Sequence, residues 1–278
     1  MRIFVIFFAV PFFHLIWRCN HYVKEGDLTL FERLIQNFTN FDAIHFQHVT
    51  SKGYLFEINH AFFPMFPYII SSLATVLKTT QIAIISFFVQ LLISYTNCIL
   101  IYRVGKKVFG GTPQNDKIAE LSAYFYIVSL STVYQISYYT ENLFLFFTLL
   151  GLYILYCKDI PNSGLYLPTT TQIVTATFIF GMATCTRSTG VLMSVFVAFF
   201  MLNKMLNKVD SCCKLFKYIL FSWFCAVIIF LPLWVIVYWK PYILHCETKL
   251  ERSNEISEWC LKPLPNVYNY IQYIYWDN

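Results

Sequence analysis

The sequence predicts an all-α polytopic membrane protein, and its composition and hydropathy pattern both support this. Hydrophobic residues make up 58% of the 278-residue chain and charged residues 13%, whereas soluble domains average roughly 45–50% and about 25%. The apolar residues form long continuous runs, which predict membrane helices and not the alternating strands of a β-barrel. The net charge of +5 is spread over connecting segments, so it indicates topology and not nucleic-acid binding.

The apolar runs divide into seven segments, which we interpret as spans of one integral membrane domain, residues 1–278. About 20 helical residues cross the hydrocarbon layer. We read the first span as uncleaved, because no small-residue cleavage site follows it. The predicted spans are Ile3 to Trp17, Ile82 to Tyr102, Ile118 to Ser137, Tyr138 or Asn142 to Cys157, Thr169 to Thr186, Ser188 to Leu202, and Tyr218 to Trp239.

Basic residues predict the orientation of these spans. Four lie between residues 103 and 117, and four more between 204 and 217. Cytoplasmic connections are enriched in Lys and Arg, so we place both segments in the cytoplasm. Residues 18–80 then form a large first loop on the lumenal side, and residues 240–278 form a lumenal C-terminal loop.

The apolar segment 64–78, of about 15 residues, is too short to span a membrane comfortably. Counting it as a span would also move the basic residues 103–117 to the outside. We therefore expect a helix that lies on the lumenal membrane surface and begins at Pro64 and Pro67.

Two features of the lumenal side depend on its compartment. The sequon Asn37-Phe38-Thr39 suits a lumenal or extracellular loop, although such a triplet also occurs by chance. Cys246 and Cys260 lie on the same side and can pair if that compartment is oxidising.

The first loop contains the strongest candidate for a catalytic group, Asp42. If residues 41–48 are helical, Asp42 and His45 share one face. A carboxylate held among aromatic side chains at a membrane surface is suited to act as a general base. The alternative is a helix cap that accepts hydrogen bonds from backbone N–H groups.

Three histidines follow Asp42 within the same loop: His45, His48 and His60. At least one is expected to hydrogen-bond a substrate headgroup, with interfacial packing as the alternative for the others. Together with Asp42 they could ligate a metal, but the HxxH spacing is only a loose match to a zinc site. We therefore expect no metal and no cofactor.

Glu141 and Arg187 are ionisable groups at the ends of apolar segments. The fourth span reaches about 20 residues only if Glu141 lies about one turn inside it, which makes this carboxylate a functional candidate; the alternative is a helix-start carboxylate favoured by the helix dipole. Arg187 needs a partner or an anion, and a phosphate suits a guanidinium; the alternative is snorkelling to the interface.

In the C-terminal loop, Trp259, Tyr268 and Tyr270 could stack on sugars or anchor at headgroups.

Four motifs in order resemble the PIG-V family of mannosyltransferases. They are FDAIHF with SKGYLFEINHAFFPMFP, then SYYTENLF, ATCTRSTG, and EWCLKPLPNVYNYIQYIYW. Three positions depart from the family pattern: Phe41 stands for the usual Trp, Met65 for Gly and Thr189 for Asn. The chain also ends soon after the fourth motif, where family members continue with further spans, so we expect a C-terminally truncated form.

The resemblance implies a GT-C-like membrane bundle in the endoplasmic reticulum. It implies inverting transfer of mannose from dolichyl-phosphate mannose, α1,6-linked, to the first mannose of a GPI precursor. Asp42 would be the catalytic base, and Arg187 would stabilise the leaving phosphate. The candidate substrate-binding residues are His45, Glu57, His60, Glu141, Arg187, Trp259, Tyr268 and Gln272.

Membrane lipids and an accessory membrane subunit are expected partners, and nucleic acid is not. Three other functions stay open at this point. The chain could be a catalytically inactive truncated form, or a GT-C enzyme that uses another dolichyl-phosphate sugar. A transporter is less favoured, because the candidate functional polar groups cluster at one membrane face.

Overall fold

The computed structural model describes residues 41–109, 112–129, 132–156, 167–208, 211–247 and 257–276. This part of the chain contains helices and no strand, as the all-α prediction requires. The predicted first span, Ile3 to Trp17, and the sequon at Asn37 lie outside the described residues.

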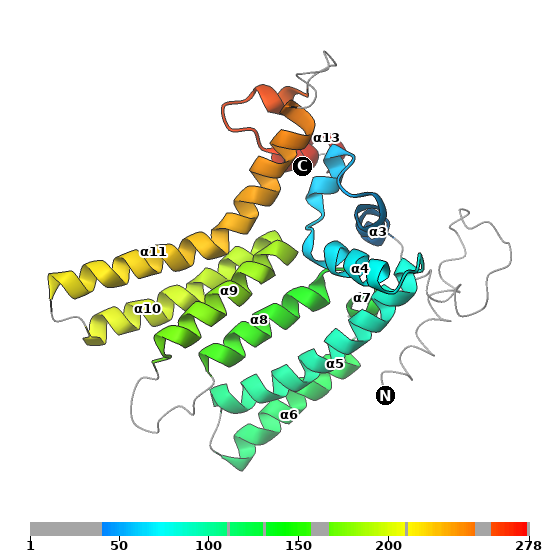
Figure 1. Cartoon of the computed structure of the whole chain (residues 1–278). Coiled ribbons are helices and arrows are strands. Elements are labelled where there is room, and N and C mark those ends of the chain that lie inside the picture. Colours follow the sequence, from blue (N-terminus) through cyan, green and yellow to red (C-terminus); the bar gives the residue numbers. More distant parts are fainter. Residues whose placement is uncertain are drawn as a thin grey trace.

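Most of the helices form a layer in which chain neighbours lie side by side (Figure 1). Within it, α5 contacts α6 and α8, while α9 contacts α8 and α11, and α10 packs against α11. The bounds of these helices are α5 Ile82–Phe109, α6 Pro113–Val128, α8 Glu141–Leu155, α9 Thr170–Thr186, α10 Ser194–Lys208 and α11 Cys212–Trp234.

The remaining elements gather at one end of this layer, where α3, α4 and α13 lie close together (Figure 1). Within α4, Phe66 and Ile70 are buried in a cluster that also contains Ile85 and Tyr138. A helix therefore forms where the sequence predicts a surface helix, and its contact with a bilayer stays a prediction. These elements are α3 Asp42–Lys52, the 3₁₀ helix η2 Glu57–Ala61, α4 Met65–Val76, η6 Glu258–Leu261 and α13 Val267–Trp276.

Three helical stretches of the described chain are long and apolar enough to cross a membrane. They are Ile82–Phe109, Ser188–Asn207, which joins the 3₁₀ helix η3 (Ser188–Met193) to α10, and Cys212–Glu247. The helices α4 and α8 are apolar but shorter. A multi-pass membrane protein is thus supported, whereas the number of seven spans stays a prediction.

The predicted third span is not a single helix. Thr112 caps α6, which ends at Val128, and a short helix α7, Thr132–Ile136, follows. Ser129 is extended, with φ −59° and ψ 139°. The prediction of one helix was wrong here, because α6 and α7 are separate helices; within α7, the backbone oxygen of Gln135 bonds to the side chain of Asn142.

The helix that contains the predicted seventh span, Tyr218 to Trp239, is longer than that span. Pro232 lies inside α11 and lacks a backbone donor, and the helix continues in the wider π form through η4, Val235–Trp239, and η5, Tyr242–Glu247. The stretch Cys212–Glu247 is 36 residues long. Its last turns therefore extend beyond the layer, toward α3 and α13 (Figure 1).

Asn142, in the first turn of α8, is the centre of a buried polar network. Its Nδ2 donates to the backbone oxygens of Gln90 and Gln135, at 3.0 and 2.9 Å. Its Oδ1 accepts hydrogen bonds from Asn97 Nδ2 at 2.8 Å and from Tyr126 Oη at 3.0 Å. Gln90, Asn97 and Asn142 are each at most 1% exposed, so these bonds join α5, α6, α7 and α8 where no water can replace them.

The side chain of Gln90 explains why the chain is not helical before α8. Its Nε2 donates to the backbone oxygens of Ser137 and Tyr139, at 3.0 and 2.6 Å. These carbonyls lie between α7 and α8, and the amide of Gln90 satisfies them in place of a helical N–H. The connection is thereby fixed against α5.

Glycines set the spacing of the layer. A Cβ atom on Gly151 of α8 would lie 2.3 Å from the ring of Phe180, and one on Gly181 of α9 would lie 3.0 Å from the carbonyl oxygen of Ile228. A larger residue at Gly151 would displace the ring of Phe180, and one at Gly181 would press on the Ile228 carbonyl. Van der Waals packing at small residues of this kind is a main source of helix association in membranes.

We expect Asn142→Leu to lower the free energy of unfolding by about 1–3 kcal/mol, because it leaves the buried partners of the amide unsatisfied. Thermal or denaturant unfolding of the purified protein in detergent measures this. The control is Asn207→Leu, since Asn207 is exposed and donates only to the backbone of its own helix. Equal stability of the two variants would contradict a central role for Asn142.

Candidate functional site

Asp42 is the first residue of α3, and it is exposed. Phe41 occupies the cap position with φ +56°, a left-handed conformation that is costly for a bulky residue. No side chain caps this helix, so Asp42 does not act as the helix cap that sequence reasoning left open. The carboxylate is accessible at the end of the helix layer that carries α3 and α4.

Tyr139 lies in the connection between α7 and α8, close to two carboxylates. Burial is the main cause that raises the pKa of its phenol to about 12, and the charges of Asp42 and Glu141 add to this shift. The phenol therefore stays protonated at neutral pH and can donate a hydrogen bond. Sequence reasoning missed Tyr139, although it is part of the SYYTENLF motif.

Glu141 and Arg187 form an ion pair between the start of α8 and the end of α9. The side chains are 47% and 38% exposed, respectively, so solvent screens the pair and it adds little to stability. The guanidinium has five N–H donors, and its other donors can bind an anion. Asp42 and Glu141 thus both lie near Tyr139, and Glu141 pairs with Arg187, so the structure connects three of the predicted site residues.

The backbone around Arg187 is fixed by Gly190. Arg187 is extended at the end of α9, and its N–H donates to the oxygen of Ala183 at 3.0 Å. The chain then turns back as η3, and a Cβ on Gly190 would lie 2.4 Å from the backbone nitrogen of Thr184. The glycine of the TRSTG motif therefore allows the turn that presents Arg187 to Glu141.

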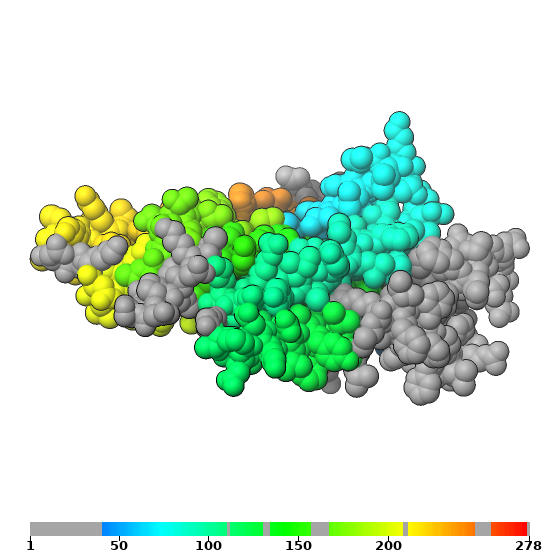
Figure 2. All heavy atoms as spheres, turned by 90° about the horizontal axis from the view of Figure 1, so that it is seen from below, coloured from blue at the N-terminus to red at the C-terminus, as the bar shows by residue number. Residues whose placement is uncertain are grey.

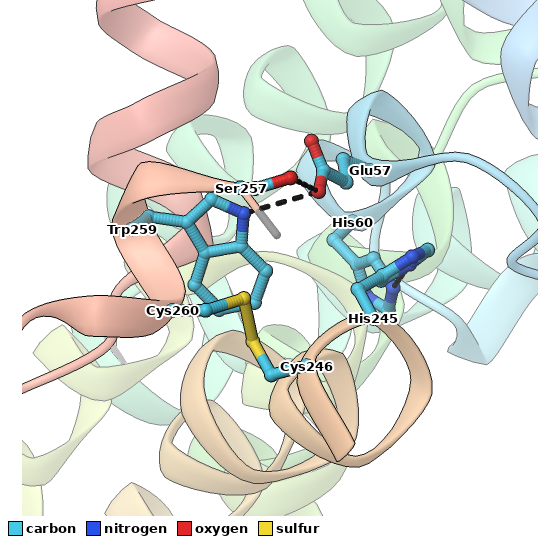
Figure 3. The surroundings of a disulfide bond; sticks show 7 residues. All are labelled: Glu57, His60, His245, Cys246, Ser257, Trp259 and Cys260. Atoms are coloured by element: carbon cyan, nitrogen blue, oxygen red, sulfur yellow. Dashed lines mark hydrogen bonds between the residues drawn. A yellow bond between two sulfur atoms is a disulfide. The ribbon is translucent and has the colours of Figure 1, made fainter. Parts of the chain in front are cut away.

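Glu57 belongs to a second group, in which the C-terminal segment is attached to η2 (Figure 3). Its Oε1 accepts hydrogen bonds from Ser257 Oγ at 2.5 Å and from Trp259 Nε1 at 3.2 Å. Cys246 and Cys260 form a disulfide beside this contact, which confirms the pairing that the sequence left open. Trp259 is fully buried, so its ring faces protein neighbours, and its stacking on a sugar stays a prediction.

His60 is buried next to His245, and the two Nε2 atoms are 3.0 Å apart (Figure 3). One ring must donate and the other accept, so at least the accepting imidazole must be neutral. Burial, together with His245 and Lys240, lowers the pKa of His60 to about 3. The ring of His60 also stacks on Tyr54, with centroids 4.6 Å apart.

The other predicted site residues are partly buried. The ring of His45 stacks on Phe62, with centroids 4.7 Å apart, and His48 Nδ1 lies 3.2 Å from Asn59 Nδ2. Tyr268 packs near the cluster of Phe63, Ile236 and Val237, and Gln272 lies in α13. Substrate contact by His45, His60, Tyr268 or Gln272 stays a prediction. Within the described residues, no group of three His, Cys, Asp or Glu side chains could hold a metal ion.

A sequence model described as Mannosyltransferase (PIG-V) matches residues 26–278. The chain belongs to this family. The match covers all four motifs and every predicted site residue.

Curated relatives carry related names. The chain is 27% identical to GPI mannosyltransferase 2 of Schizosaccharomyces pombe over 91% of its own length and 50% of the relative. It is 27% identical to GPI alpha-1,6-mannosyltransferase 2 of Cricetulus griseus over 89% and 52%, and 26% identical to GPI mannosyltransferase 2 of Aspergillus oryzae over 85% and 52%. This PIG-V family member thus spans about half the length of these relatives. No solved structure matches the chain significantly.

Acidification is expected to destabilise this PIG-V family member through His60. The unfolded histidine binds a proton below pH 6.5, whereas the folded one does so only near pH 3. Folding stability is therefore full above pH 6.5 and falls between pH 6.5 and 3, by at most about 1.4 kcal/mol per pH unit for one proton. Unfolding temperatures of the wild type and of His60→Gln, measured from pH 7.5 to 4.5, test this, because the variant should lose part of the slope. Parallel curves would contradict the assignment.

Loss of the disulfide is expected to loosen the C-terminal segment. Cys246→Ser opens a loop with a sequence separation of 14, which should reduce the free energy of unfolding by about 2–4 kcal/mol. The control is Cys212→Ser, because Cys212 is an exposed free cysteine. Peptide mapping under non-reducing conditions should show Cys246 linked to Cys260, and finding both as free thiols would contradict the structure.

Proposed function

We propose that this chain acts as an inverting mannosyltransferase in the lumen of the endoplasmic reticulum. The proposed donor is dolichyl-phosphate mannose, and the acceptor is the first mannose of a GPI precursor, linked α1,6. One observation carries the proposal: in a PIG-V family member, an accessible Asp42 lies near a Glu141–Arg187 pair that can bind a phosphate.

The proposed reaction needs one displacement. The acceptor oxygen attacks the anomeric carbon as Asp42 takes the hydroxyl proton, and the bond from that carbon to the phosphate oxygen breaks with its electron pair going to the phosphate. Dolichyl phosphate leaves as an anion, so no general acid is needed, unlike in inverting glycosidases, which use two carboxylates. Arg187 then stabilises the charge that develops on the leaving phosphate.

Glu141 has a positioning role in this proposal. In the absence of substrate it holds Arg187 at the end of α9, and it can accept a hydrogen bond from a sugar hydroxyl when Arg187 binds the phosphate. Tyr139 can donate to the same sugar, since its pKa of about 12 keeps the phenol protonated. Glu57 already accepts two hydrogen bonds from the C-terminal segment, so it contributes to the site by holding that segment in place.

The disulfide supports the proposed lumenal location of the site. Structural disulfides persist in oxidising compartments such as the lumen of the endoplasmic reticulum and are rare in the cytosol. Cys246 and Cys260 lie on the elements that gather with α3 at one end of the helix layer. The basic residues between 204 and 217 lie at the far end of α10 and α11, as the positive-inside rule requires for a cytoplasmic connection.

Membrane lipids and an accessory membrane subunit are the further partners that we propose.

Asp42→Asn is expected to reduce mannosyl transfer by about 10²–10⁴-fold, the usual contribution of a general base. The chain is expressed in cells that lack the second GPI mannosyltransferase, and surface GPI-anchored proteins are counted. The matched control is Asp116→Asn, which removes a carboxylate that pairs with Lys106 at 3.2 Å, away from the site.

The outcomes separate the functions. Restoration by the wild type and by Asp116→Asn, but not by Asp42→Asn, supports the proposal. Accumulation of a single-mannose precursor despite good expression of the wild type would show that this length of chain is inactive by itself. Restoration by Asp42→Asn at the wild-type level would exclude Asp42 as the base.

A further inference from the structure

The phenol of Tyr54 is a buried donor near α3, and the proposed reaction does not use it. Tyr54 lies in the segment between α3 and η2 and is 9% exposed. Its hydroxyl donates a hydrogen bond to the backbone oxygen of Phe62 at 2.6 Å. Burial raises the pKa of Tyr54 well above its usual value, and the nearby Tyr68 adds to this shift. The phenol therefore stays protonated at neutral pH and keeps its hydrogen on the Phe62 carbonyl.

Phe62 connects this hydrogen bond to α3. Its ring stacks on the ring of His45, with centroids 4.7 Å apart and an angle of 11° between the planes. It also meets the buried ring of Phe46 edge-on, with centroids 5.1 Å apart. His45 and Phe46 lie three and four residues after Asp42, which is the spacing of neighbours on a helix surface. Phe62 therefore packs against the first turns of α3, where Asp42 lies.

The ring of Tyr54 is held by His60 and by the end of the long helix that contains α11. It stacks on His60, with centroids 4.6 Å apart, and the ammonium of Lys240 lies 4.4 Å from its centroid. Lys240, between η4 and η5, also donates to the hydroxyl of Tyr68 in α4. In Figure 2, orange residues near 240 likewise lie beside light-blue residues of the first loop. Because a cation is attracted to an aromatic face, the ring is fixed by contacts that do not involve its hydroxyl.

We propose that Tyr54 is a positioning residue for Asp42 and acts through Phe62. This role rests on the proposed mannosyl transfer, in which Asp42 takes the acceptor proton. A base works only within hydrogen-bond reach of that proton, and a displacement of about 1 Å can cost about 10²-fold in rate. Without the hydroxyl of Tyr54, the carbonyl of Phe62 loses this donor, and the ring that packs against α3 can shift.

The test compares Tyr54→Phe with Tyr238→Phe as the matched control. Each change removes one phenol hydroxyl, and Tyr238 Oη accepts a hydrogen bond from Asn266 at 3.2 Å, a contact that does not involve α3. Each chain is purified in detergent, and transfer is measured with radiolabelled dolichyl-phosphate mannose and a single-mannose GPI precursor. We expect Tyr54→Phe to lower kcat by about 10–100-fold and to change the KM for either substrate by less than about twofold, whereas the control keeps the wild-type values.

Two further measurements separate positioning from a simple loss of stability. In the Asp42→Asn background, Tyr54→Phe should cause no further loss of transfer, since the base that it positions is already gone. Hydrogen–deuterium exchange should be faster in peptides from α3 of Tyr54→Phe and unchanged in the same peptides of the control.

The results also distinguish this role from the proposed function. A kcat of Tyr54→Phe equal to that of the control, or an equal further loss in the Asp42→Asn background, would overturn the positioning role. If the wild type transfers no mannose, the proposed function fails, and the exchange measurement then decides for Tyr54. Unchanged exchange in α3 would overturn its role, whereas faster exchange would show that it holds α3 in place without the proposed reaction.

Discussion

The buried amide of Asn142 is the constraint on which the arrangement of helices depends. Its hydrogen bonds reach α5, α6 and the backbone of α7, and its partners Gln90, Asn97 and Gln135 are buried. Because a membrane provides no substitute donors, these bonds fix the rotation of α8 about its axis. Glu141 directly precedes Asn142, so the same bonds set the direction of Glu141 and bring it to Arg187.

A second constraint joins parts of the chain that are about 200 residues apart. The carboxylate of Glu57 holds Ser257 and Trp259, and the disulfide ties the π-helical end of the long helix to η6. Lipid gives no hydrophobic driving force between helices, so orientation in this protein comes from polar bonds, a covalent link and close contacts at glycine. Hydrophobic burial between α3, α4 and α5 then completes the end of the layer that carries Asp42.

The two ends of the layer thus differ in their chemistry. Asp42, Tyr139, Glu141 and Arg187 combine carboxylates, a phenol and one guanidinium, which suits proton transfer beside a phosphate. The opposite end carries Lys204, Lys214 and Lys217 around a cavity between α9, α10 and α11.

The sequence by itself determined the all-α class, most helix positions, the family motifs and the ionisable residues, because these depend on local hydropathy and residue type. It could not pair Glu141 with Arg187 or place Tyr139 beside Asp42, since these contacts join segments far apart in the chain. It also treated residues 118–137 as one helix, although α6 ends at Val128, and it could not show that the side chains of Gln90 and Asn142 hold the backbone of residues 135–139. Only the tertiary structure buried Trp259 and His60, since burial depends on which helices pack around a side chain.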